Sequence, residues 1–205
     1  MKKSWIVIGA IVVVLVIIVG WCISTYNGMF TEETKVDESW ANVESQYQRR
    51  KDLIPNLEKT VKAFAKHEEK TFVDVTKART AAARAQQVAD GLPKEVPADQ
   101  QELDRYMAAQ NEAKRTLDIY VNAVTEAYPE LKSNQNFMDF QENLTGTENR
   151  IQVARTNYNE AVKNYNLKVG RFPGKMVAGL FGFQKKSMFR ADADASLAPS
   201  VFDEE

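Results

Sequence analysis

The sequence predicts an all-α protein in which an N-terminal transmembrane helix precedes an antiparallel, up-and-down bundle of long helices. Three observations predict this class. The first is an uninterrupted apolar segment near the N-terminus, and the second is a set of apolar stripes with heptad spacing. The third is a scarcity of chain breakers, because only 9 Gly and 6 Pro occur among 205 residues, which favours long elements over short strands and turns.

The apolar segment covers residues 5–23 and contains no charged side chain. At ~1.5 Å per residue it is long enough to cross most of a ~30 Å hydrocarbon layer. Trp5 and Trp21 stand at its two ends, where amphipathic rings favour the membrane–water interface, so we predict that they anchor the helix. A cleaved signal peptide is the alternative, but its apolar region is shorter and ends in small residues, whereas Trp21, Cys22 and Ile23 end this one.

The charges that flank this segment predict its orientation. Lys2 and Lys3 precede it and only Lys35 follows closely, so residues 1–4 are expected to lie in the cytoplasm. The chain would then be a single-pass protein of the bacterial inner (cytoplasmic) membrane. Its bulk would lie in the periplasm or outside the cell.

Residues 24–190 are predicted to form the bundle, with helices at about 31–89, 99–128 and 134–170. Each helix carries an apolar stripe that needs a partner, and the residues between helices are typical of turns that make neighbours antiparallel. Pro55 leaves two possibilities for the first helix, since an interior proline removes a backbone hydrogen bond. The helix either kinks there, giving three long helices, or reverses, giving four. The unbroken heptad phase across the proline favours the kink.

The kinked alternative predicts self-association. The returning helix is shorter than the first helix, so the membrane-proximal part of the first stripe would lack a partner, as is typical of a protein–protein surface. In the reversed alternative the same residues lie inside the bundle, and the reason to expect a homo-oligomer disappears. The self-association strip consists of Val36, Trp40, Val43, Tyr47 and Ile54.

Composition restricts the chemistry that is open to the chain. The 27 basic and 28 acidic residues give a net charge of −1, and without a clustered basic excess we expect no nucleic-acid binding. With one Cys and one His, the chain has too few ligands for a zinc site made of protein side chains, and a catalytic cysteine–histidine pair would need both of these single residues. No phosphate-binding loop or nucleophile motif occurs, so we expect no enzymatic activity, no cofactor and no small-molecule substrate.

A polar cluster around Pro55 is the main candidate for a structural or interaction site. Arg50 falls on the apolar stripe, where an unpaired charge would be costly to bury, so we expect it to find a carboxylate such as Glu148. The alternative is that the cluster binds an acidic segment of a partner protein. The candidate residues are Arg49, Arg50, Asp52, Pro55, Asn56, Glu148 and Asn149.

His67 and Glu68 are two further candidates. The position four residues after the histidine is Thr71, so a second imidazole is missing from the same helix face and metal binding is not expected. We expect His67 to be a satisfied residue at the surface or edge of the bundle, and Glu68, which falls on the apolar stripe, to be a second polar group that sets the register of the helices.

Residues 171–190 form a short amphipathic segment with five basic residues and no acid. It could dock on the bundle's own end, contact anionic lipid or contact a partner protein. In the kinked alternative it lies far from the anchoring membrane, and in the reversed alternative it returns toward that membrane. The candidate contact residues are Phe172, Lys175, Met176, Leu180, Phe181, Phe183, Lys185 and Lys186. Residues 191–205 contain five acids and no base and are expected to form a flexible acidic tail.

Several short motifs along the chain are together specific. These are Tyr26–Asn27, Arg49–Leu57 with the sequence RRKDLIPNL, His67–Glu68, Ala78–Arg79, Pro129–Leu131, Thr147–Asn149, Tyr158–Asn159, Tyr165–Asn166, Phe172–Pro173 and Phe181–Phe183. With them the chain resembles the LemA family of bacterial proteins over nearly its whole length. The resemblance implies a short membrane segment and an all-helical body, and it implies no established activity, substrate or cofactor.

These observations favour a non-catalytic scaffold or adaptor of the bacterial cell envelope, with the membrane, other envelope proteins and a second copy of the chain as partners. One alternative is a membrane-organising protein that binds anionic lipid through residues 171–190. The other is an unrecognised hydrolase that uses carboxylates, although no spacing among the 28 acids singles out a pair.

Overall fold

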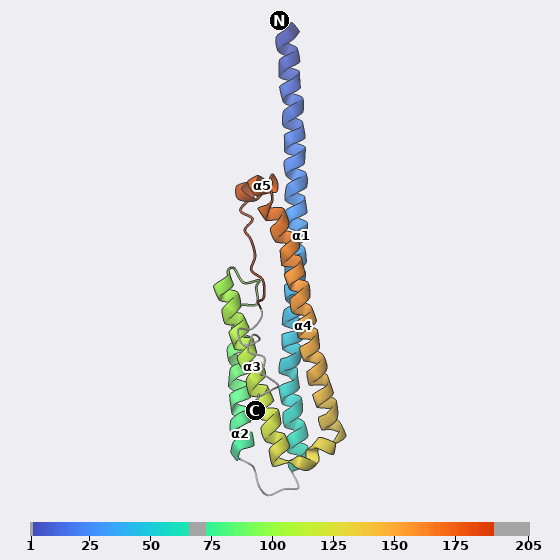
Figure 1. The fold of residues 1–205 in the computed structure, drawn as a ribbon, viewed down its shortest axis with the longest axis vertical. Helices are drawn as coiled ribbons and strands as arrows, with labels where there is room; N and C mark the ends of the chain where they lie inside the picture. The colour runs from blue at the N-terminus through green and yellow to red at the C-terminus, as the bar shows by residue number, and fades with distance from the viewer. Residues whose placement is uncertain (1, 66–72, 191–205) are drawn as a thin grey trace, which may run out of the picture.

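A computed structural model of the chain describes residues 2–65 and 73–190 (Figure 1). The described part is entirely helical or irregular, which confirms the predicted fold class. Its elements are α1 (Lys2–Ala65), α2 (Val73–Asp90), α3 (Gln100–Ala127), the 3₁₀ helix η1 (Pro129–Ser133), α4 (Gln135–Gly170) and α5 (Gly174–Phe181).

The first two helices are antiparallel. In the last quarter of α1 the Lys51 ammonium lies 2.7 Å from the Asp90 carboxylate at the end of α2. Further along α1 the Glu58 carboxylate lies 2.7 Å from the guanidinium of Arg79, which comes earlier in α2. Residue numbers therefore rise along one helix as they fall along the other.

The last long helix is also antiparallel to the first. Glu32, near the apolar segment of α1, lies 3.0 Å from Lys168 at the end of α4. Arg50, further along α1, lies 3.4 Å from Glu148 earlier in α4. Together with α2 and α3 this gives an up-and-down arrangement in which the last helix returns to the end of the bundle from which the apolar segment projects (Figure 1).

The point of reversal differs from both alternatives for the first helix. α1 continues through Pro55 and ends at Ala65, and α2 begins at Val73. The predicted single helix over 31–89 is therefore wrong: the chain turns between these two helices, and the bundle has four long helices (Figure 1).

The apolar neighbours of Pro55 explain why the helix passes through it. Proline removes one helical hydrogen bond, at a cost of ~3 kcal/mol in a helix interior. Leu53, Ile54 and Leu57 are all buried against the other helices, while Pro55 itself is exposed. Burying a Leu or Ile side chain contributes ~2 kcal/mol, so these three residues offset the lost bond.

The other two long helices begin and end within one residue of their predicted limits. Asp99 caps α3, since its carboxylate accepts a hydrogen bond from the Glu102 amide at 2.8 Å. Asn134 caps α4 by accepting from the Asn136 amide at 3.0 Å. Local cap chemistry therefore marks both starts.

The self-association strip is covered by the chain itself. Val36, Trp40, Val43, Tyr47 and Ile54 are all at least 92% buried, and α4 packs along the same side of α1. The argument for a homo-oligomer depended on this strip being uncovered, so it fails. The strip is covered because α4 runs back toward the apolar segment along α1, whereas in the kinked alternative the last long helix runs away from the membrane.

Trp40 shows how closely the strip is covered. Its ring centroid lies 5.0 Å from that of Tyr106 on α3, 5.3 Å from that of Tyr158 on α4, and 5.9 Å from that of Phe189 in the C-terminal segment. Its indole N–H donates to the Lys94 carbonyl at 2.9 Å. Four separate parts of the chain therefore contact this one side chain.

The apolar segment of α1 has no such cover. Every described side chain from Trp5 to Gly20 is exposed, whereas Met29 on the same helix is only 1% exposed. Figure 1 shows this part of α1 projecting beyond the bundle. It is the one helix of the described residues that is long and apolar enough to cross a membrane, and it suggests membrane anchoring.

Candidate functional site

The polar centre of the bundle is built on Arg50. This side chain is 2% exposed, and one guanidinium nitrogen, Nη2, donates to both the backbone oxygen and the side-chain oxygen of Gln110, at 2.8 and 2.7 Å. The other, Nη1, lies 3.4 Å from the Glu148 carboxylate, and the guanidinium stacks 5.0 Å from the Tyr47 ring centroid. The predicted pairing of Arg50 with Glu148 is confirmed, and the residue joins α1, α3 and α4.

The other residues of the predicted polar cluster do not form a site together with Arg50 and Glu148. Arg49, Asp52, Asn56 and Asn149 are exposed, as is Pro55. Asp52 accepts a hydrogen bond from Gln48 at 2.9 Å, one turn back on α1. Of this cluster, only Arg50 and Glu148 reach across helices. His67 and Glu68 lie outside the described residues, as do residues 191–205.

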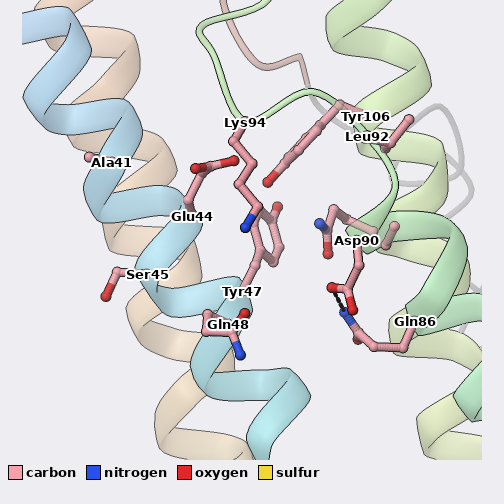
Figure 2. A pocket seen from close by; sticks show the side chains of 12 residues that line it. Ala41, Glu44, Ser45, Tyr47, Gln48, Gln86, Asp90, Leu92, Lys94 and Tyr106 are labelled. Atoms are coloured by element: carbon pink, nitrogen blue, oxygen red, sulfur yellow. Dashed lines mark hydrogen bonds between the residues drawn. The ribbon is translucent and has the colours of Figure 1, made fainter.

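An open cleft of about 290 Å³ lies beside this centre, between α1, the end of α2, the connection to α3, and α3 itself (Figure 2). Figure 2 shows Glu44 and Lys94 on its walls, with Tyr47 and Tyr106 beside them. Asp90 also lines the cleft, but Gln86 donates to it at 3.0 Å.

Burial raises the pKa of two groups in this cleft, Glu44 and Tyr106. Loss of solvent raises the pKa of the Glu44 carboxyl, and the nearby Lys94 charge opposes that rise. Burial also raises the pKa of the Tyr106 hydroxyl well above its usual range. Within residues 2–65 and 73–190, no group of three or more His, Cys, Asp and Glu side chains is placed to hold a metal ion.

A second structured region is the C-terminal strap, defined here as residues 183–190, which runs as an extended segment along α4 (Figure 1). Asn166 donates to the Lys186 carbonyl at 2.8 Å and accepts from the Lys186 amide at 2.9 Å. Asn159 likewise donates to the Phe189 carbonyl at 2.9 Å and accepts from the Phe189 amide at 2.8 Å. Each asparagine amide thus replaces the backbone partner that a neighbouring strand would supply.

The strap holds two of the predicted lipid-contact residues against the bundle. Lys186 pairs with Glu33 at 3.0 Å and lies 3.6 Å from Asp37. Phe183 packs against the Tyr26 ring with centroids 5.4 Å apart. These two side chains are therefore engaged by their own chain, in agreement with docking of this part of residues 171–190.

The remaining predicted contact residues of this segment stay exposed. Except for Lys185, which is in the strap, they lie in or beside α5, which stands next to α1 at the same end of the bundle as the apolar segment (Figure 1). Exposed members are Phe172, Lys175, Met176, Leu180, Phe181 and Lys185. The predicted anchors Trp5 and Trp21 are 76% and 40% exposed on the projecting part of α1.

The sequence did not predict the cleft or the strap. The cleft depends on how the α2–α3 connection folds over α1, for which no local signal exists. The strap had one signal, since Tyr158–Asn159 and Tyr165–Asn166 repeat after seven residues on one face of α4. That spacing places both asparagines in one row.

These features define an all-helical bundle protein with one helix suited to a membrane. The family model for LemA matches residues 39–202, so the chain belongs to the LemA family. Two relatives are the magnetosome proteins MamQ 1 and MamQ 2 of Paramagnetospirillum magneticum strain AMB-1, and each is 29% identical over 85 residues. The matched segment covers 40% of this chain and 31% of each relative, so the chain spans less than a third of their length.

Proposed function

We propose that the protein is a non-catalytic, single-span scaffold or adaptor of the bacterial cell envelope. The amino terminus lies in the cytoplasm, and the bundle lies on the outer side of the cytoplasmic membrane, where it binds other envelope proteins. The bundle presents a long helical surface at a fixed distance from the bilayer.

One observation carries the proposal. α1 is a single helix whose first part is fully exposed and apolar, and whose second part forms the core of the bundle from Met29 onward. Burying apolar surface contributes ~25 cal/mol per Å², so a row of uncovered Ile, Val and Leu side chains favours a bilayer over water. The orientation is supported by Lys2 and Lys3 ahead of the segment.

Features of the bundle favour binding over catalysis. The described clefts are open to solvent, and the carboxylate of Asp90 in the cleft of Figure 2 is engaged by Lys51 and Gln86. The guanidinium of Arg50 is already hydrogen-bonded to Gln110 on α3 and Glu148 on α4, so it joins three helices. The exposed residues of the polar cluster remain available to a partner protein.

Cross-linking of intact cells with a membrane-impermeant lysine reagent tests this function. Lys59 and Lys163 are exposed on α1 and α4, so both should react from outside and yield links to envelope proteins that mass spectrometry identifies. Strong reaction only after lysis would place the bundle in the cytoplasm. Reaction in intact cells without any link to another protein would contradict the scaffold.

A further inference from the structure

The outer face of α5 is apolar and uncovered. Met176 and Leu180 are four residues apart on α5 and are 67% and 75% exposed, and Phe172, two residues before the helix begins, is 82% exposed. The next residue, Phe181, is 53% exposed. Such a cluster of large apolar side chains on one short helix is unusual for a surface that faces water alone.

α5 stands at the level where the apolar segment of α1 ends. The Phe181 ring lies 4.9 Å from the ring of Tyr26, centroid to centroid. Tyr26 follows Ile23, the last residue of the apolar segment, by three positions, or ~4.5 Å along the helix. A bilayer has an interfacial layer of ~5 to 7 Å on each side of its hydrocarbon core, so the Phe181 end of α5 lies at interfacial depth when α1 spans the membrane.

The inner face of α5 holds the helix in this position. Val177 and Ala178 are 3% and 2% exposed and pack on the bundle. A Cβ atom on Gly174 would lie 2.7 Å from the Lys168 carbonyl oxygen, so the glycine permits the close approach of α5 to α4. Gly182, with φ of 80°, ends the helix in a left-handed conformation and starts the strap. The outer face is therefore presented by a supported helix.

Charge at this end complements an anionic surface. Arg171, Lys175 and Lys185 are exposed around α5, and no acid occurs from residue 171 to residue 190. Lys186 is the exception among the basic residues there, because Glu33 and Asp37 engage it. A juxtamembrane basic residue attracts anionic lipid headgroups.

From these observations we infer that α5 is a second membrane contact, which inserts Phe172, Met176 and Leu180 into the lipid leaflet from which α1 emerges. Arg171 and Lys175 contact anionic headgroups beside it. The inference depends on the proposed membrane anchor and adds a lipid ligand to it. The bundle is then attached to the membrane through both α1 and α5, and the contact of α5 determines the tilt of the bundle relative to the bilayer.

Nitroxide labelling of the full chain in lipid vesicles tests this contact. In a Cys22→Ser background, single labels are placed through Leu180→Cys, Val88→Cys and Val12→Cys. Collision with oxygen, which concentrates in the bilayer, is compared with collision with a water-soluble nickel chelate. We expect the oxygen-to-nickel ratio at Leu180 to exceed that at Val88 and to lie below that at Val12, because α5 is at interfacial depth and Val12 is near the centre of the span.

The two other positions act as matched controls. Val88 is 64% exposed on α2, close to Asp90, whose partner Lys51 lies ~42 Å along α1 from Ile23. Val12 is 53% exposed within the apolar segment. A bilayer signal at Val12 with a water signal at Leu180 would overturn the α5 contact and leave the anchor intact. A water signal at Val12 would overturn the anchor as well.

Lipid composition and charge reversal complete the test. The double variant Arg171→Glu and Lys175→Glu should lower the ratio at Leu180 in vesicles that contain phosphatidylglycerol, with a smaller effect in pure phosphatidylcholine. An unchanged ratio in both would overturn the headgroup contact. A Leu180 label shielded from oxygen and nickel alike would mean that protein covers α5, which would overturn the lipid contact.

Discussion

At the scale of single residues, Arg50 shows how one buried charge can determine the register of several helices. The position belongs to an apolar stripe, yet its side chain reaches Gln110 on α3 and Glu148 on α4. A buried cation is tolerated only when acceptors surround it. Sliding any of the three helices by one turn, ~5.4 Å, would separate the guanidinium from its acceptors.

Replacing Arg50 should therefore destabilise the protein. We expect Arg50→Ala to lower the free energy of unfolding by about 3 kcal/mol, because charged hydrogen bonds and buried packing are lost together. Urea unfolding of residues 24–205 measures this. Arg49→Ala is the control, and its exposed side chain should change the value by less than ~0.5 kcal/mol.

A double-mutant cycle separates the contribution of the carboxylate. We expect Arg50→Ala and Glu148→Ala to couple by ~1 kcal/mol, since the two side chains lie 3.4 Å apart and Glu148 is only partly shielded. Additive effects of the two substitutions in urea unfolding would contradict a structural role for this pair and favour binding of an external acid.

The Glu32–Lys168 pair should make stability depend on pH. A hydrogen bond from the Lys168 ammonium, opposed in part by burial, holds the pKa of Glu32 below its ordinary value of 4.5. A lowered pKa in the folded state means that the pair stabilises the protein above that ordinary value, and that the contribution is lost as the pH falls through the folded-state pKa.

Lys168→Met is the variant that isolates this contribution. Its loss of stability relative to the parent should be larger at pH 7 than at pH 3, as followed by thermal unfolding across that range. A residual difference should remain at low pH, because Lys168 also donates to the Gly28 carbonyl at 3.2 Å. Lys163→Met, at an exposed position of α4, is the control, and an equal loss at both pH values would contradict the assignment.

At the scale of elements, α4 binds α1 and the strap with two different parts of its surface. Its apolar stripe packs on α1, and its row of asparagines receives the strap. Because Asn159 and Asn166 bond to both the amide and the carbonyl of one strap residue each, they fix an extended segment that has no strand beside it in the described structure. The strap in turn carries Phe189 onto Trp40.

Removing one asparagine should release the strap without unfolding the helices. We expect Asn159→Ala to speed amide hydrogen exchange of residues 183–190 and to lower the free energy of unfolding by ~1 to 3 kcal/mol, because two hydrogen bonds disappear. Mass-detected exchange measures the first effect. Asn157→Ala, an exposed asparagine on the same helix, should leave strap exchange unchanged.

The elements also show what the sequence could and could not predict. α3 and α4 were predicted within one residue from their apolar stripes and the turn residues between them, and the structure shows that Asp99 and Asn134 cap the two starts. The reversal between α1 and α2 was missed because residues 66–72 contain neither glycine nor proline, and because the two stripes happen to share one heptad phase. Pro55 was given too much weight, since burial of its neighbours offsets one lost hydrogen bond.

The same contrast applies to the candidate site. A charge on an apolar stripe requires a partner wherever it lies, so the pairing of Arg50 with Glu148 was predictable. The path of the strap was not, because it depends on side chains of α4 that are 20 to 30 residues earlier in the chain. The exposed face of α5 could not be predicted either, because it depends on where the strap lies.

At the scale of the whole molecule, the bundle is closed around its own apolar stripes. The strip that was expected to join two copies instead contacts α3, α4 and the strap through Trp40. We therefore expect Trp40→Ala to lower the free energy of unfolding by ~3 to 5 kcal/mol without changing the oligomeric state. Urea unfolding and sedimentation of the full chain in nanodiscs measure the two effects, and dissociation of an oligomer in the variant would contradict this view.

The unbroken α1 has a further consequence for the azimuth of the bundle. Since one helix runs from the apolar segment into the core, any twist of the segment about its axis turns the bundle by the same angle. Each residue advances a helix by ~100°, so one alanine inserted after Tyr26 would swing every face of the bundle by that angle relative to the segment. The rotational phase of a single helix therefore determines which side of the bundle points in a given direction around the axis of the apolar segment.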